Sequence, residues 1–433
     1  MSGNGNGNGN GNGHSRRADD LVKWLYPGIR VKRWIAGLAL GVGIASLGLA
    51  YAFVRLVAPP GSQLYVYVPR GIPAIAVLMG ALIAGLSMVG LYRAVVYPLT
   101  PQNGHTTVNQ LYRYRKRQRG PKVVAIGGGT GLASLLRGLK EHTDHLTAVV
   151  TVADDGGSSG RLRRELGVLP PGDFRNCIVA LAETEPIMAR LFEYRFGAGS
   201  VLEGHSFGNL FIVAMSGVTG TFPEALKETG RVLAVRGQVL PSTLESVALL
   251  ARLEDGHTVY GESRIPSGGS PIRRVELEPS DPAAYPEAVQ AIREAELIVI
   301  GPGSLYTSVM PNLLVSGIAQ AVRESSATRV YVCNVATQPG ETDGYTVHDH
   351  VIALHRHVGA GLFDYVLANN NIAPLPKDWP NSVVAKDGAV PGVIEVTADL
   401  VKDDYRLRHD PEKLASRLMA LYCECRNRQP VRR

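Results

Sequence analysis

A glycine-rich turn is the first place in this chain where residue types and their spacing could do chemistry. It follows the apolar run 123–126 and consists of Gly127, Gly128, Gly129, Thr130 and Gly131. Leucines at helical spacing come next, so the pattern predicts a buried parallel strand, a tight turn and an amphipathic helix. The first turn of a helix offers unpaired N–H groups to an anion, and glycine lets a ligand approach the backbone. The sequence therefore predicts a phosphate-binding turn.

A second loop, residues 151–161, adds paired acids and hydroxyls. Asp154 and Asp155 are adjacent, and Ser158 and Ser159 follow them. A dinucleotide site would have a glycine at Leu132 and one acid after the second strand, so NAD(P) and flavin are not expected. Paired carboxylates suit a hydrated Mg²⁺ beside phosphates, or hydrogen bonds to sugar hydroxyls. We expect both aspartates to be catalytic and metal-binding, with Mg²⁺ as the candidate cofactor; the alternative is that they only cap helices.

Polar loops also follow two later predicted strands, 297–300 and 330–333. Ligands of an open parallel sheet bind outside the carboxyl ends of its strands, so these loops belong to the same expected site. An arginine after the acidic loop could neutralise phosphate, and a helix predicted to begin at residue 207 could point its N-terminus at the ligand. The ligand-binding residues expected from these patterns are Gly127, Gly128, Gly129, Thr130, Gly131, Ser158, Ser159, Arg175, Asn209, Gly301, Gly303, Ser304 and Asn334.

Three other patterns in the sequence do not predict a catalytic or metal site. Residues 204–208 match G-x-S-x-G, but no core strand precedes them, which favours an N-capped helix over a serine nucleophile. The histidines at 348, 350, 355 and 357 have no recognised zinc spacing. The cysteines form no C-x-x-C pair, which is typical of reduced thiols in a cytosolic compartment.

Strand and helix patterns alternate from residue 121 onward. Such alternation predicts an α/β fold whose mostly parallel sheet is covered by helices on both faces. The segment 249–277 alternates with period two around an Asp-Gly turn and predicts an inserted antiparallel β-hairpin. The predicted strands of the main sheet are 123–126, 148–153, 297–300, 330–333 and 365–368.

The N-terminal part has a different composition. Residues 1–121 contain 14 Lys and Arg but only two acids, so the basic pI describes this part alone, and no nucleic-acid partner is expected. Two charge-free apolar runs, 34–54 and 71–92, are long enough to cross a bilayer. Basic residues flank the pair on the outside, so the positive-inside rule places both termini and the main domain in the cytoplasm. The alternative is a pair of core helices in a soluble domain.

These patterns predict four parts. A disordered Gly/Asn-rich and basic cytoplasmic tail would occupy 1–33, a transmembrane hairpin 34–92, a basic linker 93–120 and an α/β domain 121–433. The protein is therefore expected to be a multi-pass protein of the plasma (inner) membrane.

Six ordered motifs carry a family resemblance that covers residues 121–433. VVAIGGGTGLASLLRGLK, VTVADDGGSSGRLRRELG, GHSFGNL, VRGQVLPST, IVIGPGSLYTSVMPNLL and VCNVATQPGETDGYT resemble the YvcK (GlmR) gluconeogenesis-factor family of the CofD-like superfamily. The resemblance implies a Rossmann-like three-layer α/β/α domain that binds UDP-N-acetylglucosamine. It also implies support of cell-wall precursor supply and cell shape during gluconeogenic growth.

The same superfamily includes the 2-phospho-L-lactate transferase of coenzyme F420 synthesis. That enzyme depends on Mg²⁺, and its acids match Asp154 and Asp155. An alternative function is therefore Mg²⁺-dependent transfer of a 2-phospho-L-lactyl or nucleotidyl group. Deazaflavin transfer is not expected, because GGSSGRLRRELG stands where the transferase holds its acceptor.

A last motif, LRHDPEKL, resembles the family's basic ligand-side segment through Arg408 and His409, and implies that Arg408 binds the ligand. We further expect a homo-oligomer and a protein partner in amino-sugar synthesis. Whether the ligand is a substrate or a signal stays open.

Overall fold

The computed structural model describes residues 31–57, 71–95, 114–183, 186–373, 379–388, 392–402 and 406–428. Most of the predicted tail and linker, and the connection between the two apolar runs, lie outside these residues. The chain divides into two units, 1–119 and 120–433, which are described separately.

The first unit contains two long apolar helices, α2 (Val31–Val57) and α3 (Ile72–Val95). Both are long and apolar enough to cross a membrane, and most of their apolar side chains are exposed. Glycines let the two backbones approach closely: a Cβ on Gly41 would lie 2.6 Å from the backbone nitrogen of Ala84. The helices are therefore compatible with the predicted membrane anchor.

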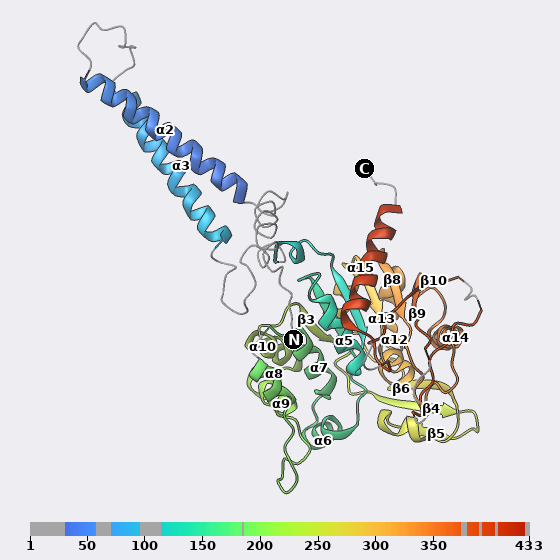
Figure 1. Ribbon diagram of the computed structural model, residues 1–433. Helices are drawn as coiled ribbons and strands as arrows, with labels where there is room; N and C mark the ends of the chain where they lie inside the picture. The colour runs from blue at the N-terminus through green and yellow to red at the C-terminus, as the bar shows by residue number, and fades with distance from the viewer. Residues whose placement is uncertain are drawn as a thin grey trace, which may run out of the picture. The chain divides into compact units, whose positions relative to one another are not determined.

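A seven-stranded sheet forms the centre of the second unit, in the order β10-β9-β8-β7-β1-β2-β3, and all its neighbours pair in parallel (Figure 1). The α/β prediction is confirmed, and all five predicted strands are present. The strands are β1 (Val123–Gly127), β2 (Leu146–Val150), β3 (Gln238–Pro241), β7 (Leu297–Ile300), β8 (Thr328–Val332), β9 (Tyr365–Asn369) and β10 (Ile394–Ala398).

Strand order reverses between β1 and β7. From β1 the chain proceeds to β2 on one side, whereas from β7 it proceeds to β8 on the other. Because crossovers between parallel strands are right-handed, the helices α5 (Gly129–Leu139) and α13 (Ser316–Glu324) cover opposite faces. The crevice at such a reversal is the usual ligand site of an open parallel sheet.

The remaining helices complete the layers. Helix α5 packs against α7 and α15, and α11 packs against α13. Leu132, Leu135, Leu136 and Leu139 of α5 are all fully buried. The other helices are α6 (Gly157–Leu166), α7 (Gly172–Leu181), α8 (Pro186–Glu193), α9 (Phe207–Thr219), α10 (Phe222–Val232), α11 (Pro286–Arg293), α12 (Met310–Leu313), α14 (Val347–Val358) and α15 (Pro411–Arg428), with short helical turns η1 (Glu262–Ser267) and η2 (Leu305–Val309).

The predicted inserted hairpin is part of a three-stranded antiparallel sheet. β4 (Ala248–Leu253) pairs with β5 (Thr258–Tyr260) across the Asp-Gly turn and with β6 (Ile272–Glu278) on its other side. The turn η1 lies between β5 and β6 and carries Glu262. The insertion therefore brings a carboxylate from outside the parallel sheet.

Candidate functional site

A cleft of about 360 Å³ lies where the loops after β1, β7 and β8 meet. Its walls come from the glycine turn, from the start of the loop after β7, and from the loop after β8. Two later segments close it, one at Asn381 and one at 407–409. The lining residues are Gly128, Gly129, Thr130, Gly131, Ser134, Pro302, Gly303, Ser304, Ser308, Asn334, Val335, Ala336, Thr337, Gln338, Asn381, Leu407, Arg408 and His409.

The glycine turn owes its shape to close packing and to one left-handed residue. Gly129 has φ of 62°, which favours glycine. A Cβ on Gly131 would lie 2.6 Å from the carbonyl oxygen of Pro302, and one on Gly128 would lie 2.6 Å from Asp173 Oδ2. The turn therefore admits no larger side chain at these positions, and the first turn of α5 faces the cleft.

Side chains of the β8 loop hold the β7 loop in place. The N–H of Gly303 donates to Asn334 Oδ1 at 3.4 Å, and Gln338 Nε2 donates to Ser304 Oγ at 2.6 Å. Asn334 Nδ2 in turn donates to Gln338 Oε1 at 3.4 Å. Asn334 therefore uses its side-chain amide to hold two loops of the cleft wall together.

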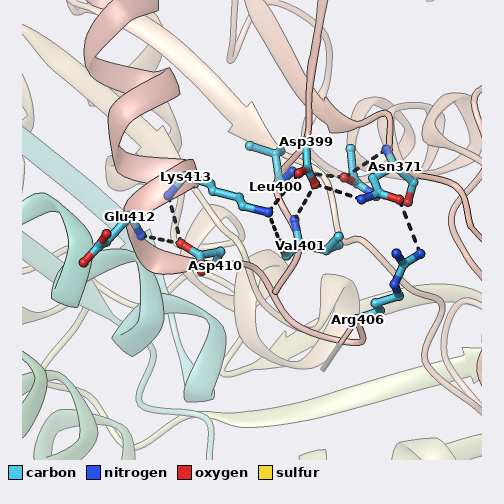
Figure 2. Close-up of polar contacts among 9 residues, drawn as sticks. Asn371, Asp399, Leu400, Val401, Arg406, Asp410, Glu412 and Lys413 are labelled. Atoms are coloured by element: carbon cyan, nitrogen blue, oxygen red, sulfur yellow. Dashed lines mark hydrogen bonds and ion pairs between the residues drawn. The ribbon is translucent and has the colours of Figure 1, made fainter. Parts of the chain in front are cut away.

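Arg408 and His409 are carried by a C-terminal strap, residues 399–402 and 406–413, shown in part in Figure 2. Lys413 Nζ donates to Asp399 Oδ2 at 2.8 Å and to the carbonyl of Val401 at 2.9 Å. Asp410 caps α15 by accepting from the N–H groups of Glu412 and Lys413, both at 2.9 Å. The N–H of Asp410 also donates to the carbonyl of Leu400 at 2.7 Å. These bonds fix the segment that closes the cleft.

A group of carboxylates adjoins the glycine turn. Asp173 Oδ2 accepts the N–H of Gly129 at 2.8 Å. Burial raises the pKa of Asp173 to about 6, and Asp154 adds to the rise. Burial also raises the pKa of Glu262 to about 9, with Asp154 and Asp173 contributing. Burial chiefly raises the pKa of Asp154 as well. Ionised, these side chains repel one another, so a proton or a cation among them is favourable.

The two predicted metal-binding acids have different surroundings. Asp154 Oδ1 accepts the N–H of Gly156 at 2.8 Å. Asp155 Oδ1 accepts the N–H of Ser263 at 2.9 Å and so holds the start of η1, the turn that carries Glu262. Within the described part of the chain, His, Cys, Asp and Glu form no group of three arranged to hold a metal ion. Mg²⁺ at Asp154 and Asp155 stays a prediction.

A separate buried cluster surrounds Ser158. Its hydroxyl lies 3.0 Å from His205 Nδ1 and accepts from Asn209 Nδ2 at 3.1 Å. Ser159 Oγ accepts the N–H of Gly172 at 3.0 Å. Arg175 is buried and donates to its neighbour Asn176 at 2.7 Å. These four predicted ligand residues make internal contacts and do not line the cleft described above.

Comparison with known proteins identifies the family. Residues 123–402 match the family described as "2-phospho-L-lactate transferase CofD". The chain belongs to the CofD family. A relative from Nostoc sp. (strain PCC 7120) is 46% identical over 430 residues and covers 94% of each chain. The "Gluconeogenesis factor" of Bacillus subtilis (strain 168) is 49% identical over 319 residues, which span 70% of this chain and 99% of that protein.

Solved structures agree with this membership. A crystal structure of a UPF0052-family protein from Bacillus halodurans is 46% identical, with a TM-score of 0.65; the match covers 70% of this chain and 99% of that one. This CofD-family chain therefore contains the gluconeogenesis-factor domain together with a further N-terminal part.

The cleft of this CofD-family domain gathers half of the residues expected from the sequence. Those that line it are Gly128, Gly129, Thr130, Gly131, Gly303, Ser304, Asn334 and Arg408. Those that do not are Gly127, Asp154, Asp155, Ser158, Ser159, Arg175, Asn209 and Gly301.

Several polar residues of the site were not among the predicted ligand residues. Ser134, Ser308, Thr337, Gln338, Asn381 and His409 line the cleft, and Asp173 and Glu262 belong to the carboxylate group beside it. Asp173 lies in a PGDF segment that reads as an ordinary helix start, Glu262 lies in the inserted sheet, and Asn381 lies in a segment without periodicity. Of these three, only Asp173 had a usable signal, since an acid soon after the second loop of an α/β unit lies at the carboxyl edge of the sheet.

Proposed function

We propose that this protein is a membrane-anchored nucleotide-sugar-binding protein whose ligand is UDP-N-acetylglucosamine, and that it supports cell-wall precursor supply and cell shape. One observation carries the proposal: the first turn of α5 and Arg408 line the same cleft at the strand-order reversal. Helix N-termini and arginine both bind phosphate, and the cleft's volume lies within the range of small-molecule sites.

The anchor belongs to the same proposal. Helices α2 and α3 cross the plasma membrane, and both termini and the CofD-family domain lie in the cytoplasm. The length, the apolar composition and the exposed apolar side chains of both helices support it. Reporters fused after residue 60 and after residue 110 test the topology. Activity of an extracytoplasmic reporter only at residue 60 is expected, and the reverse pattern would overturn the orientation.

Calorimetric titration of the full chain in nanodiscs with UDP-N-acetylglucosamine tests the ligand. Submillimolar binding is expected, and Arg408→Ala should weaken it at least about tenfold because one charge-assisted phosphate contact is lost. Arg273→Ala, an exposed arginine on β6, is the matched control. A folded chain that gives no heat at submillimolar ligand refutes the proposal.

A second function, Mg²⁺-dependent transfer of a phosphoryl-linked or nucleotidyl group, is favoured by the carboxylates beside the glycine turn. Asp154, predicted together with Asp155 to bind the ion, and Asp173, whose Oδ2 accepts the Gly129 N–H at 2.8 Å, are the residues that would hold it beside the turn. Mg²⁺ would neutralise the phosphates there. Transfer of radiolabel from a labelled nucleotide donor, abolished by Asp154→Asn with binding retained, would establish this activity. A binding protein gives no labelled product.

A further inference from the structure

His409 is a polar residue in the wall of the cleft, and one of its two ring nitrogens is already hydrogen-bonded within the protein. Its side chain is 6% exposed, and Nε2 lies 3.2 Å from the carbonyl oxygen of Cys333, directly after β8. A carbonyl oxygen only accepts hydrogen bonds, so Nε2 carries the proton and donates it. The bond therefore fixes which tautomer the ring adopts.

The other ring nitrogen is left as an acceptor. Burial lowers the pKa of His409 to about 4, so the ring is neutral at physiological pH and Nδ1 has a free lone pair. No described residue donates to Nδ1. Nδ1 of His409 is also not among the fully buried side-chain atoms without a partner, whereas Nε2 of His350 is. Because His409 lines the cleft and its Nε2 is engaged, Nδ1 is the ring nitrogen left to a ligand there.

The position of this nitrogen is fixed from two sides. Cys333 holds Nε2, and the strap holds the backbone through the bridge between Val401 and His409 and through the bond from Asp410 N–H to the Leu400 carbonyl. Figure 2 shows that Lys413, in the first turn of α15, reaches back to Asp399 and to the carbonyl of Val401. An acceptor held this way costs little ordering when a ligand binds.

We propose that His409 is a specificity-determining residue whose Nδ1 accepts a hydrogen bond from an uncharged N–H or O–H donor of the nucleotide sugar. The inference rests on the proposed function of the cleft. The donor is the imide N–H of the pyrimidine, a ribose hydroxyl, or an O–H or amide N–H of the N-acetylglucosamine. The phosphates contribute no such donor and bind instead at the glycine turn and Arg408. A ligand without a donor at this place leaves Nδ1 desolvated and unpaired, which lowers its affinity.

Two substitutions separate the two ring nitrogens. His409→Gln places an amide where Nε2 stands, keeps the bond to the Cys333 carbonyl and removes the acceptor at Nδ1. His409→Asn places its carbonyl oxygen near the position of Nδ1 and removes the bond to Cys333. We expect His409→Gln to weaken UDP-N-acetylglucosamine about tenfold and to leave pyrophosphate binding unchanged. His409→Asn should weaken the sugar nucleotide less than about threefold. His355→Gln, away from the cleft, is the control.

Two ligand variants identify the donor by titration of the full chain in nanodiscs. If the imide is the donor, methylation of the pyrimidine N3 weakens the wild type about tenfold and does not affect His409→Gln. If the donor belongs to the N-acetylglucosamine, UDP without this sugar binds both chains equally. If it is a ribose hydroxyl, UDP binds His409→Gln more weakly than the wild type and methylation of N3 has no effect. Each of these results supports the inference. Unchanged binding of UDP-N-acetylglucosamine by His409→Gln, or an equal loss of pyrophosphate, overturns it alone. A wild-type chain that does not bind UDP-N-acetylglucosamine overturns it together with the proposed function.

Discussion

The carboxylate of Asp173 accepts a 2.8 Å hydrogen bond from the backbone N–H of Gly129, inside the turn that faces the cleft. One of the N–H groups that a phosphate would use is thus already paired with an acid of this chain. A bound anion therefore shares the turn with a negative charge unless a cation accompanies it or Asp173 takes up a proton.

Asp173→Asn is therefore expected to strengthen metal-free binding. Asparagine retains an acceptor for Gly129 but removes the charge that repels a diphosphate. Affinity for UDP-N-acetylglucosamine in EDTA should rise about three- to tenfold, whereas added Mg²⁺ should help the wild type more than the variant. Titration calorimetry measures both, with Glu228→Gln on α10, whose side chain is 30% exposed and pairs with Arg231, as control. Weaker binding of Asp173→Asn in EDTA would contradict this account.

We expect ligand affinity to depend on the hydrogen bonds that hold the strap in place. Lys413→Ala removes the bonds to Asp399 and Val401 that hold the segment bearing Arg408 and His409. We expect a three- to tenfold loss of UDP-N-acetylglucosamine affinity, of the order of 1 kcal/mol, with a small change in Tm because the pair is partly exposed. Arg417→Ala, which breaks an ion pair with Glu424 on the same helix, should bind as the wild type does. Equal loss in both variants would assign the effect to α15 as a whole.

The glycine turn and the central strands could be predicted because their signals are local. An apolar run followed by glycines and by leucines at helical spacing determines β1, the turn and α5 from adjacent residues alone. β3 and β10, the two edge strands, were not predicted from the sequence. β3 is only four residues long and ends in Pro241. β10 has partly exposed side chains and no apolar run.

The composition of the carboxylate group could not be predicted, since it depends on pairing between distant segments. Glu262 lies in the turn η1 between β5 and β6, which the bond from the Ser263 N–H to Asp155 joins to the loop after β2. The adjacent pair of aspartates suggested two equivalent ligands, but neighbouring residues on a loop point in different directions. The β-bridge between Ala336 and Val383 places Asn381 beside the cleft. Such a long-range pairing leaves no local pattern in the sequence.

Glu262 should make stability depend on pH. Its pKa rises from 4.5 to about 9 in the folded protein, so the folded state binds more protons than the unfolded chain between these values. The free energy of unfolding therefore falls as pH rises from about 4.5 to about 9. Glu262→Gln removes the ionisable group, so its Tm should fall less between pH 6 and pH 8.5 and exceed that of the wild type at pH 8.5.

Thermal unfolding at both pH values, with and without millimolar Mg²⁺, measures the effect of Glu262. Mg²⁺ should raise the Tm of the wild type at pH 8.5 more than that of Glu262→Gln. Glu254→Gln, at the exposed end of the β4–β5 hairpin, should follow the wild type. Parallel pH profiles for Glu262→Gln and the wild type would show that the site carries no proton at neutral pH.

The contact between α2 and α3 can be tested with neighbouring glycines in one helix. A Cβ on Gly41 would lie 2.6 Å from the Ala84 nitrogen and 2.8 Å from the Gly80 carbonyl oxygen, whereas one on Gly43 would meet nothing within 4 Å. Gly41→Leu should therefore force the helices apart, and Gly43→Leu, with the same change in helix propensity, should not.

A disulfide reports this separation. A Cβ on Gly37 would lie 3.6 Å from the Ser87 Cβ, within the range of a disulfide. Gly37→Cys with Ser87→Cys should cross-link in oxidised membranes and keep the helices joined after cleavage at a protease site inserted in the 58–70 connection. Gly41→Leu should reduce the cross-linked fraction severalfold and Gly43→Leu should leave it unchanged. Equal cross-linking in both variants would show that the glycines do not set the distance between the helices.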